Sequence, residues 1–145
     1  MTSKSKNINS DRIRLLLIDD EKDFVNILAK RMKRRNIDVT KAFSGAEAIQ
    51  SLRGQEFDVA ILDLKMEDMD GIEVLKMLKI MDPNLTVIML TGHGSAEAAQ
   101  KGIKLGAFDY LTKPCELEQL LKKILEAHKG RKLKKSIPLP DNVER

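Results

Sequence analysis

The chain has 145 residues, 42% apolar and 33% charged, which fits one folded domain and is too apolar for a disordered chain. Its single cysteine excludes a disulfide framework and a multi-cysteine zinc site. No apolar run approaches the roughly 20 residues of a membrane helix. The polar start of the chain also lacks the apolar segment of a signal peptide. A cytoplasmic protein without membrane contact is therefore expected.

The net charge of +4 is unevenly distributed. Residues 13–127 hold 17 basic and 19 acidic side chains, a net charge of −2, while the flanks hold 9 basic and 3 acidic residues, a net charge of +6. Because the basic excess lies outside the body, a nucleic-acid-binding surface on the body is not expected. Residues 1–11 are expected to be a disordered tail, and residues 131–145 a basic, proline-containing tail or linker. The basic run 129–135 is either a solvated helix end or an electrostatic contact with nucleic acid or an acidic partner.

Five short apolar runs alternate with segments of helical periodicity. The apolar runs are residues 13–18, 37–42, 59–62, 85–90 and 107–111. They are nearly continuous, as expected of strands buried on both faces. The helical segments are residues 24–32, 46–52, 72–79, 96–105 and 117–125. Five strand–helix units predict a doubly wound α/β fold, with one parallel sheet covered by helices on both faces.

Polar side chains follow four of the five predicted strands. Asp19 and Asp20 follow the first strand, Asp63 the third, Thr91 the fourth and Lys113 the fifth. In open α/β sheets, ligands bind outside the carboxyl ends of the strands. We therefore expect these side chains to converge on one edge of the sheet.

Three neighbouring carboxylates require a counter-charge, so either their pKa values rise or a cation binds. Carboxylate oxygens with room for water suit Mg²⁺. Zinc would require histidine or cysteine, and neither His93 nor Cys115 has partners at ligand spacing. The expected cofactor is Mg²⁺.

A carboxylate beside a divalent cation can attack phosphorus and form an aspartyl phosphate. Phosphoryl transfer depends mainly on positioning and on neutralising the phosphoryl oxygens. Lys113 supplies a second cation and Thr91 a hydroxyl donor. Backbone N–H groups at Lys65 and Gly92 are further candidate donors.

The run DLKMEDMDG at residues 63–71, together with Asp19-Asp20, Thr91 and Lys113-Pro114, resembles the receiver domain of bacterial two-component response regulators. The resemblance covers about residues 13–129 and places a receiver domain at residues 12–130. It implies a (βα)5 flavodoxin-like sandwich whose five-stranded parallel sheet has the order 2-1-3-4-5.

The resemblance also implies a role for each site residue. Asp63 would be the phospho-acceptor, and Thr91 and Lys113 would be the other catalytic groups, in contact with the phosphoryl group. Thr91 and Tyr110 would form a switch that responds to phosphorylation.

For the metal, the resemblance implies that Asp20 ligates Mg²⁺ directly and that Asp19 acts mostly through water. Asp63 and the carbonyl of Lys65 would complete the protein ligands. It also suggests a cis bond between Lys113 and Pro114.

Two positions depart from the family pattern. Glu67 stands where the family usually has proline, which predicts a looser loop after Asp63. Cys115 replaces an aromatic or aliphatic residue. Neither position carries a group that does chemistry, so the predicted site is unchanged.

The resulting hypothesis is a phosphorylation-controlled switch, not a metabolic enzyme, that receives a phosphoryl group from a histidine kinase or a histidine phosphotransfer protein. A homodimer or another partner would use the face formed by residues 96–105, the fifth strand and residues 117–125. One alternative is an aspartate-nucleophile phosphatase, but that class needs a second acid where Lys65 stands. The other is a pseudo-receiver that only binds partners, which the intact set of site residues disfavours.

Overall fold

The computed structural model describes residues 12–92 and 96–136. The predicted tail 1–11, the loop residue His93 and residues 137–145 lie outside this part. Five strands form one parallel sheet of order β2-β1-β3-β4-β5, which confirms the predicted fold. The strands are β1 (Ile13–Ile18), β2 (Ile37–Ala42), β3 (Val59–Asp63), β4 (Thr86–Thr91) and β5 (Asp109–Thr112). The helices are α2 (Lys22–Lys33), α3 (Gly45–Gly54), α4 (Gly71–Met81), α5 (Ala96–Lys104) and α6 (Leu117–Ser136).

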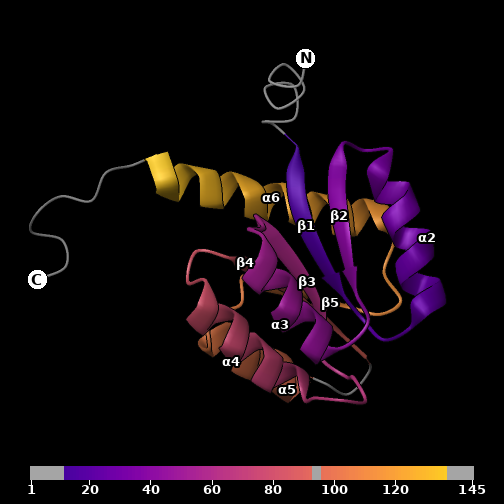
Figure 1. The fold of residues 1–145 in the computed structure, drawn as a ribbon, viewed down its shortest axis with the longest axis vertical. Helices are drawn as coiled ribbons and strands as arrows, with labels where there is room; N and C mark the ends of the chain where they lie inside the picture. The colour runs from indigo at the N-terminus through magenta and orange to yellow at the C-terminus, as the bar shows by residue number, and fades with distance from the viewer. Residues whose placement is uncertain (1–11, 93–95, 137–145) are drawn as a thin grey trace, which may run out of the picture.

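Helices cover both faces of the sheet (Figure 1). Alternate residues of β1 enter different cores: Leu15 and Leu17 pack with α2 and α6, whereas Leu16 and Ile18 pack with α3 and α4. Successive side chains of a strand point to opposite faces, so one apolar run supplies both layers. This explains why successive residues of the central strands are apolar, with no alternation of apolar and polar side chains.

The two edge strands differ from the prediction of burial on both faces. Strands β1, β3 and β4 are almost wholly buried, but β2 and β5 include partly or fully exposed positions. An edge strand has a neighbour on one side only, which leaves part of its length uncovered. The edge position of β5 places Tyr110 where its side chain reaches solvent.

Local signals fix the starts of the helices near the carboxyl end of the sheet. The Ser44 side chain accepts a hydrogen bond from the Glu47 N–H, and Asp70 accepts one from Ile72. Both are N-caps that satisfy a free backbone donor of the first helical turn. A Cβ atom at Gly71 would collide with the backbone of Leu64. Glycine therefore lets α4 begin directly against the end of β3.

Helix α6 is longer than expected. The apolar stripe predicted a helix over residues 117–125, but α6 continues to Ser136 and projects past the sheet (Figure 1). The extension is rich in lysine, which has a high helix propensity but no place in an apolar stripe. The predicted tail boundary at residue 131 thus falls within a helix. None of the helices described is both long enough and apolar enough to cross a membrane.

Candidate functional site

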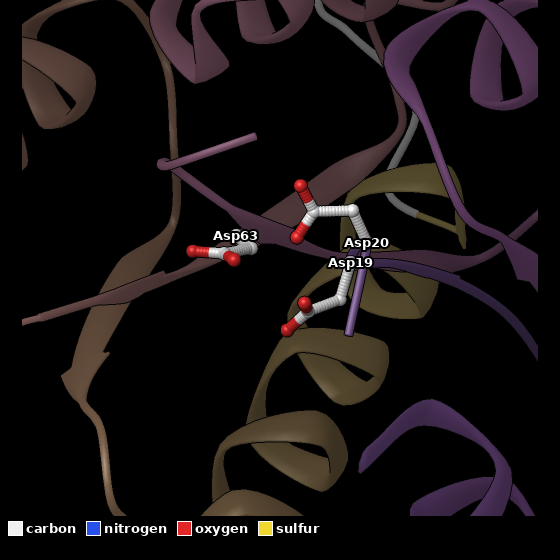
Figure 2. Close-up of side chains that lie close together, drawn as sticks. All are labelled: Asp19, Asp20 and Asp63. Carbon is white, nitrogen blue, oxygen red and sulfur yellow. The ribbon is translucent and has the colours of Figure 1, made fainter. Parts of the chain in front are cut away.

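Three carboxylates gather at the carboxyl ends of β1 and β3. These strands are neighbours in register, with Ile18 opposite Leu62, so the residues after them lie at the same level. One oxygen from each of Asp19, Asp20 and Asp63 lies within 4.8 Å of the others (Figure 2). Asp19 and Asp63 are buried, whereas Asp20 is partly exposed. The predicted convergence is therefore present in the structure.

Backbone N–H groups orient all three carboxylates. Asp19 Oδ1 accepts from the N–H of Glu21 at 3.0 Å, and Asp63 Oδ1 accepts from Lys65 at 3.1 Å. Asp20 Oδ2 accepts from the N–H of Glu67 at 3.0 Å. Hydrogen bonds to an ionised carboxylate stabilise its charge and fix its direction. The loops after β1 and β3 thus hold the acids in place through their own backbone.

Lys113, directly after β5, brings a positive charge into the acidic cluster. Its Nζ lies 2.7 Å from Asp19 Oδ2, 2.7 Å from Glu21 Oε1 and 3.5 Å from Asp63 Oδ2. It also lies 4.6 Å from the centre of the Phe24 ring, at cation–π distance. Burial opposes the charged form, but the hydrogen bonds with Asp19 and Glu21 raise the pKa of Lys113. The ammonium is therefore a fixed cation at the edge of the site.

The carboxyl group of Asp63 is a weaker acid than an ordinary aspartate. Burial raises its pKa to about 6, and repulsion from Asp19 adds to the rise, while the Lys65 N–H and Lys113 oppose it. The three acids of the cluster also outnumber Lys113, the cation that contacts two of them, so negative charge is in excess at the site. A bound cation would relieve this imbalance, and the oxygen donors present suit a hard ion.

The loop after Asp63 is tied at several points. Lys65 and Asp70 form an isolated antiparallel bridge. The Asp68 carboxylate accepts hydrogen bonds from Gly45 and Ala46, the first residues of α3, at 3.0 and 3.1 Å, and these bonds lower its pKa. The N–H that Glu67 donates to Asp20 is one that proline would lack. The residue expected to loosen the loop therefore supplies one of its contacts.

Thr91 and Tyr110 lie in different environments. Thr91 ends β4, is buried, and its hydroxyl lies 3.5 Å from the carbonyl oxygen of Leu111. Tyr110 lies opposite Met89 in the β4–β5 ladder and is 40% exposed. The structure thus has a buried hydroxyl at the site and an exposed aromatic ring on the edge strand.

The residues after β5 also match the predicted geometry. The peptide bond between Lys113 and Pro114 is cis. Cys115 is a free, half-buried thiol whose pKa is raised by burial, as expected of an unreactive packing residue. Among the residues described, Glu21 is the site member whose role was not foreseen. Its place directly after two site acids was the available signal.

Comparison with known proteins identifies the family. Residues 15–125 match the response regulator receiver domain. The chain is 36% identical over 110 residues to the transcriptional regulatory protein ZraR of Escherichia coli, covering 76% of this chain and 25% of ZraR. It is 34% identical over 128 residues to the photosynthetic apparatus regulatory protein RegA of Cereibacter sphaeroides, covering 88% of this chain and 67% of RegA. The chain thus spans about a quarter of the length of ZraR.

Solved structures agree. The receiver domain of Francisella response regulator 1452 superposes with a TM-score of 0.76 at 33% identity, covering 82% of this chain and 98% of that domain. A CheY-like receiver domain protein from Methanospirillum hungatei gives a TM-score of 0.82 at 27% identity, covering 86% of this chain and 99% of that protein. With the same sheet order and an acidic cluster at the expected edge, the chain belongs to the receiver domains of two-component response regulators.

Proposed function

We propose that Asp63 accepts a phosphoryl group from a histidine kinase or a histidine phosphotransfer protein, and that the aspartyl phosphate switches a partner-binding face. The observation that carries this proposal is the position of Asp63: a buried carboxylate within 4.8 Å of two other acids and 3.5 Å from the Lys113 ammonium. This setting suits phosphoryl transfer, because the neighbouring acids can hold a metal ion and the ammonium can neutralise the phosphoryl oxygens.

The transfer can be written with the chain's own groups. An Asp63 oxygen forms a bond to phosphorus while the phosphorus–nitrogen bond of the donor phosphohistidine breaks. The imidazole nitrogen keeps the electron pair of that bond. Lys113 neutralises phosphoryl charge, and the Thr91 hydroxyl and the Lys65 N–H donate hydrogen bonds. Above pH 6 most Asp63 is ionised and able to attack, given its pKa of about 6.

Mg²⁺ is the proposed cofactor because the cluster offers oxygen donors only. Asp20 would bind it directly, Asp19 mostly through water, and Asp63 and the Lys65 carbonyl would complete the protein ligands. When bound, the ion neutralises charge on the phosphoryl oxygens. In the structure, Lys113 and the Glu21 N–H already engage both Asp19 oxygens, whereas Asp20 is bound through one oxygen by Glu67. This difference supports Asp20 as the direct ligand.

The proposed switch links Thr91 to the α5–β5–α6 face. A phosphoryl group on Asp63 would attract the Thr91 hydroxyl and make room for Tyr110 to turn inward. The buried residues of α5 are Ala99 and Gly102, both small, so little apolar surface anchors this helix. Large apolar side chains are exposed on α5 and β5: Ile103 and Tyr110. A homodimer or another partner protein that covers them is the proposed readout.

We further propose that the chain works in the cytoplasm as a regulator, not as a metabolic enzyme. The aspartate-nucleophile phosphatase considered from the sequence needs a general acid two residues after Asp63, and that residue is an exposed lysine, Lys65. Two of the similar proteins, ZraR and GlrR of Escherichia coli, are named as transcriptional regulatory proteins. An output of that kind would lie outside the receiver domain, so nucleic-acid contact is not proposed for this chain alone.

The chemistry is tested with a small phosphodonor. Acetyl phosphate and Mg²⁺ should add one phosphoryl group, about 80 Da by intact-mass measurement, and Asp63→Asn should abolish the addition because the nucleophile is lost. Asp38→Asn, at an exposed position of β2, is the matched control and should be labelled like the wild type. Undiminished labelling of Asp63→Asn would refute the assignment.

The switch is tested by Thr91→Ala. The variant should still be phosphorylated on Asp63, because the hydroxyl is not the nucleophile. The conformation of Tyr110 should, however, no longer respond to this phosphorylation. Backbone amide spectra with and without donor provide the measurement. In the wild type we expect changes in β5 and α5, and in Thr91→Ala we expect them to remain in the loops around Asp63. Wild-type changes confined to those loops would contradict the mechanism.

A further inference from the structure

The Lys113 ammonium is held closer to the segment between β1 and α2 than to Asp63. Its contacts with Asp19 and Glu21 are 2.7 Å each, whereas Asp63 Oδ2 is 3.5 Å away. A lysine ammonium has three N–H donors, and two are spent on short, charge-assisted hydrogen bonds to these two acids. The cation expected to meet a phosphoryl group is thus engaged elsewhere.

Of the two short contacts, Glu21 is the one that can be released. Asp19 is fully buried and is also fixed by a backbone N–H, while the Glu21 side chain is 64% exposed. Glu21 is the N-cap residue of α2, but its side chain makes no capping hydrogen bond. Its carboxylate is turned to Lys113 instead of to the free N–H groups of its own helix.

A phosphoryl group on Asp63 would compete with Glu21 for Lys113. Its oxygens carry nearly two negative charges in place of the single charge of the Asp63 carboxylate, so about one negative charge and three strong acceptor oxygens are gained beside the ammonium. An exposed carboxylate cannot outweigh this charge, so Glu21 would delay the movement of Lys113 but not prevent it. The Phe24 ring of α2, 4.6 Å from Nζ, makes a further contact between this helix and the cation.

We propose that Glu21 is a positioning residue that holds Lys113 toward α2 in the unphosphorylated protein and thereby slows phosphoryl transfer to Asp63. The inference rests on the proposed function above. With acetyl phosphate, the donor's phosphorus–oxygen bond breaks, acetate leaves with the electron pair, and an Asp63 oxygen forms the new bond to phosphorus. Lys113 meets the phosphoryl oxygens only after leaving Glu21, so breaking that contact adds to the barrier.

The main experiment compares phosphorylation rates by intact mass, with acetyl phosphate and saturating Mg²⁺ so that a change in metal affinity does not enter. Glu21→Gln keeps the size of the side chain and removes its charge, and we expect phosphorylation to be about 1.5- to 5-fold faster, the effect of one exposed ion pair. Glu21→Asp restores the charge and should return the rate toward that of the wild type. Asp23→Asn removes an exposed charge two residues away and should leave the rate unchanged.

Two further measurements identify Lys113 as the target. In a Lys113→Gln background, Glu21→Gln should have no effect on the rate. In the unphosphorylated protein, the NMR signals of the Lys113 Cε methylene should shift in Glu21→Gln and stay in place in Asp23→Asn. If Glu21 acted independently of Lys113, the acceleration by Glu21→Gln would persist in the Lys113→Gln background, and the Lys113 signals would not shift.

The outcomes separate the two proposals. If the wild type takes up no phosphoryl group, the proposed function fails and this inference fails with it. If the wild type is labelled but Glu21→Gln is no faster, only the role of Glu21 is overturned. An equal acceleration by Asp23→Asn, or an acceleration that persists in Lys113→Gln, would overturn it as well, because the effect would then be general charge or independent of Lys113.

Discussion

Two aspartates at opposite ends of β3 are buried to the same extent, 5% exposed each, and have opposite surroundings. Asp58, just before the strand, accepts hydrogen bonds from the Arg14 backbone N–H at 2.9 Å and from its guanidinium at 3.0 and 3.2 Å. Asp63, at the end of the strand, has one backbone donor and a cation 3.5 Å away that other acids share. One carboxylate is matched by its own cation and the other is not.

The difference shows how one strand serves both stability and chemistry. The hydrogen bond with Asp58 raises the pKa of Arg14, so the guanidinium at the amino end of the strand stays charged at any physiological pH. Breaking such a pair destabilises the fold, because removal of one partner leaves the charge of the other unmatched. At the carboxyl end the mismatch leaves negative charge available for a metal and a phosphoryl group. Burial alone therefore does not distinguish a structural acid from a reactive one.

The largest effect is expected at the structural acid. Asp58→Ala should lower the free energy of unfolding by about 3 kcal/mol, since it removes a buried ion pair whose Arg14 side chain retains partial access to water. Urea unfolding measures the change. Asp38→Asn, on the exposed side of β2, is the control and should shift stability little. A loss of stability no greater than that of the control would mean that Arg14 does not stabilise Asp58. The proposed difference between Asp58 and Asp63 would then be wrong.

The reactive acid should behave in the opposite way. The pKa of Asp63, about 6, lies some two units above the ordinary 3.8. This difference means that the folded protein disfavours the charged form of Asp63 by at most about 3 kcal/mol. Between pH 4 and 6 the unfolded chain releases this proton first, so Asp63 lowers the stability of the wild type as pH rises through this window. Asp63→Asn should therefore stabilise the metal-free protein by about 2 kcal/mol at pH 7.

Thermal or urea unfolding of Asp63→Asn at several pH values measures this effect. Below pH 4 the Asp63 side chain of the wild type is mostly protonated and neutral, like the asparagine of the variant. The difference in stability between the two proteins should therefore disappear there. A stabilisation that is the same at pH 3.5 and pH 7 would show that charge at Asp63 is not its cause.

The smallest effect concerns the metal. Mg²⁺ at ten times its dissociation constant should stabilise the wild type by about 1.4 kcal/mol through mass action. Asp20→Ala should weaken Mg²⁺ binding more than Asp19→Ala, because both Asp19 oxygens already have partners in Lys113 and the Glu21 N–H. A Mg²⁺ titration of the three proteins measures the difference. Equal affinities in all three would contradict a metal site in the acidic cluster.

Much of the site could be predicted from the sequence, because residues that directly follow parallel strands lie at the same edge of the sheet. Polar residues directly after apolar runs had to meet once the runs formed one parallel sheet, and Asp19, Asp63 and Lys113 do so. The sheet order itself came from the family resemblance, since apolar runs do not reveal which strands are neighbours. Central strands were predicted well, whereas the edge strands were less buried than their composition indicated.

The contacts that depend on side-chain length and on distant loops could not be predicted. Glu21 reaches Lys113 across 92 positions of sequence, and Asp68 caps α3 from 22 and 23 residues further along the chain. Nothing local marks either residue, because both belong to polar stretches in which exposed acids are common. The length of α6 was underestimated for a different reason: charged residues continue a helix without continuing its apolar stripe.

The long reach of these contacts has a consequence for the order of folding. Asp19 and Lys113 are 94 positions apart, and β1 joins β3 only after the chain between them has crossed over the sheet. Contacts of such separation form late, because loop closure must precede them. During synthesis, the site cannot assemble until residue 113 has left the ribosome. Only a domain that is nearly complete and folded could then accept a phosphoryl group, and incomplete chains would not take part in signalling.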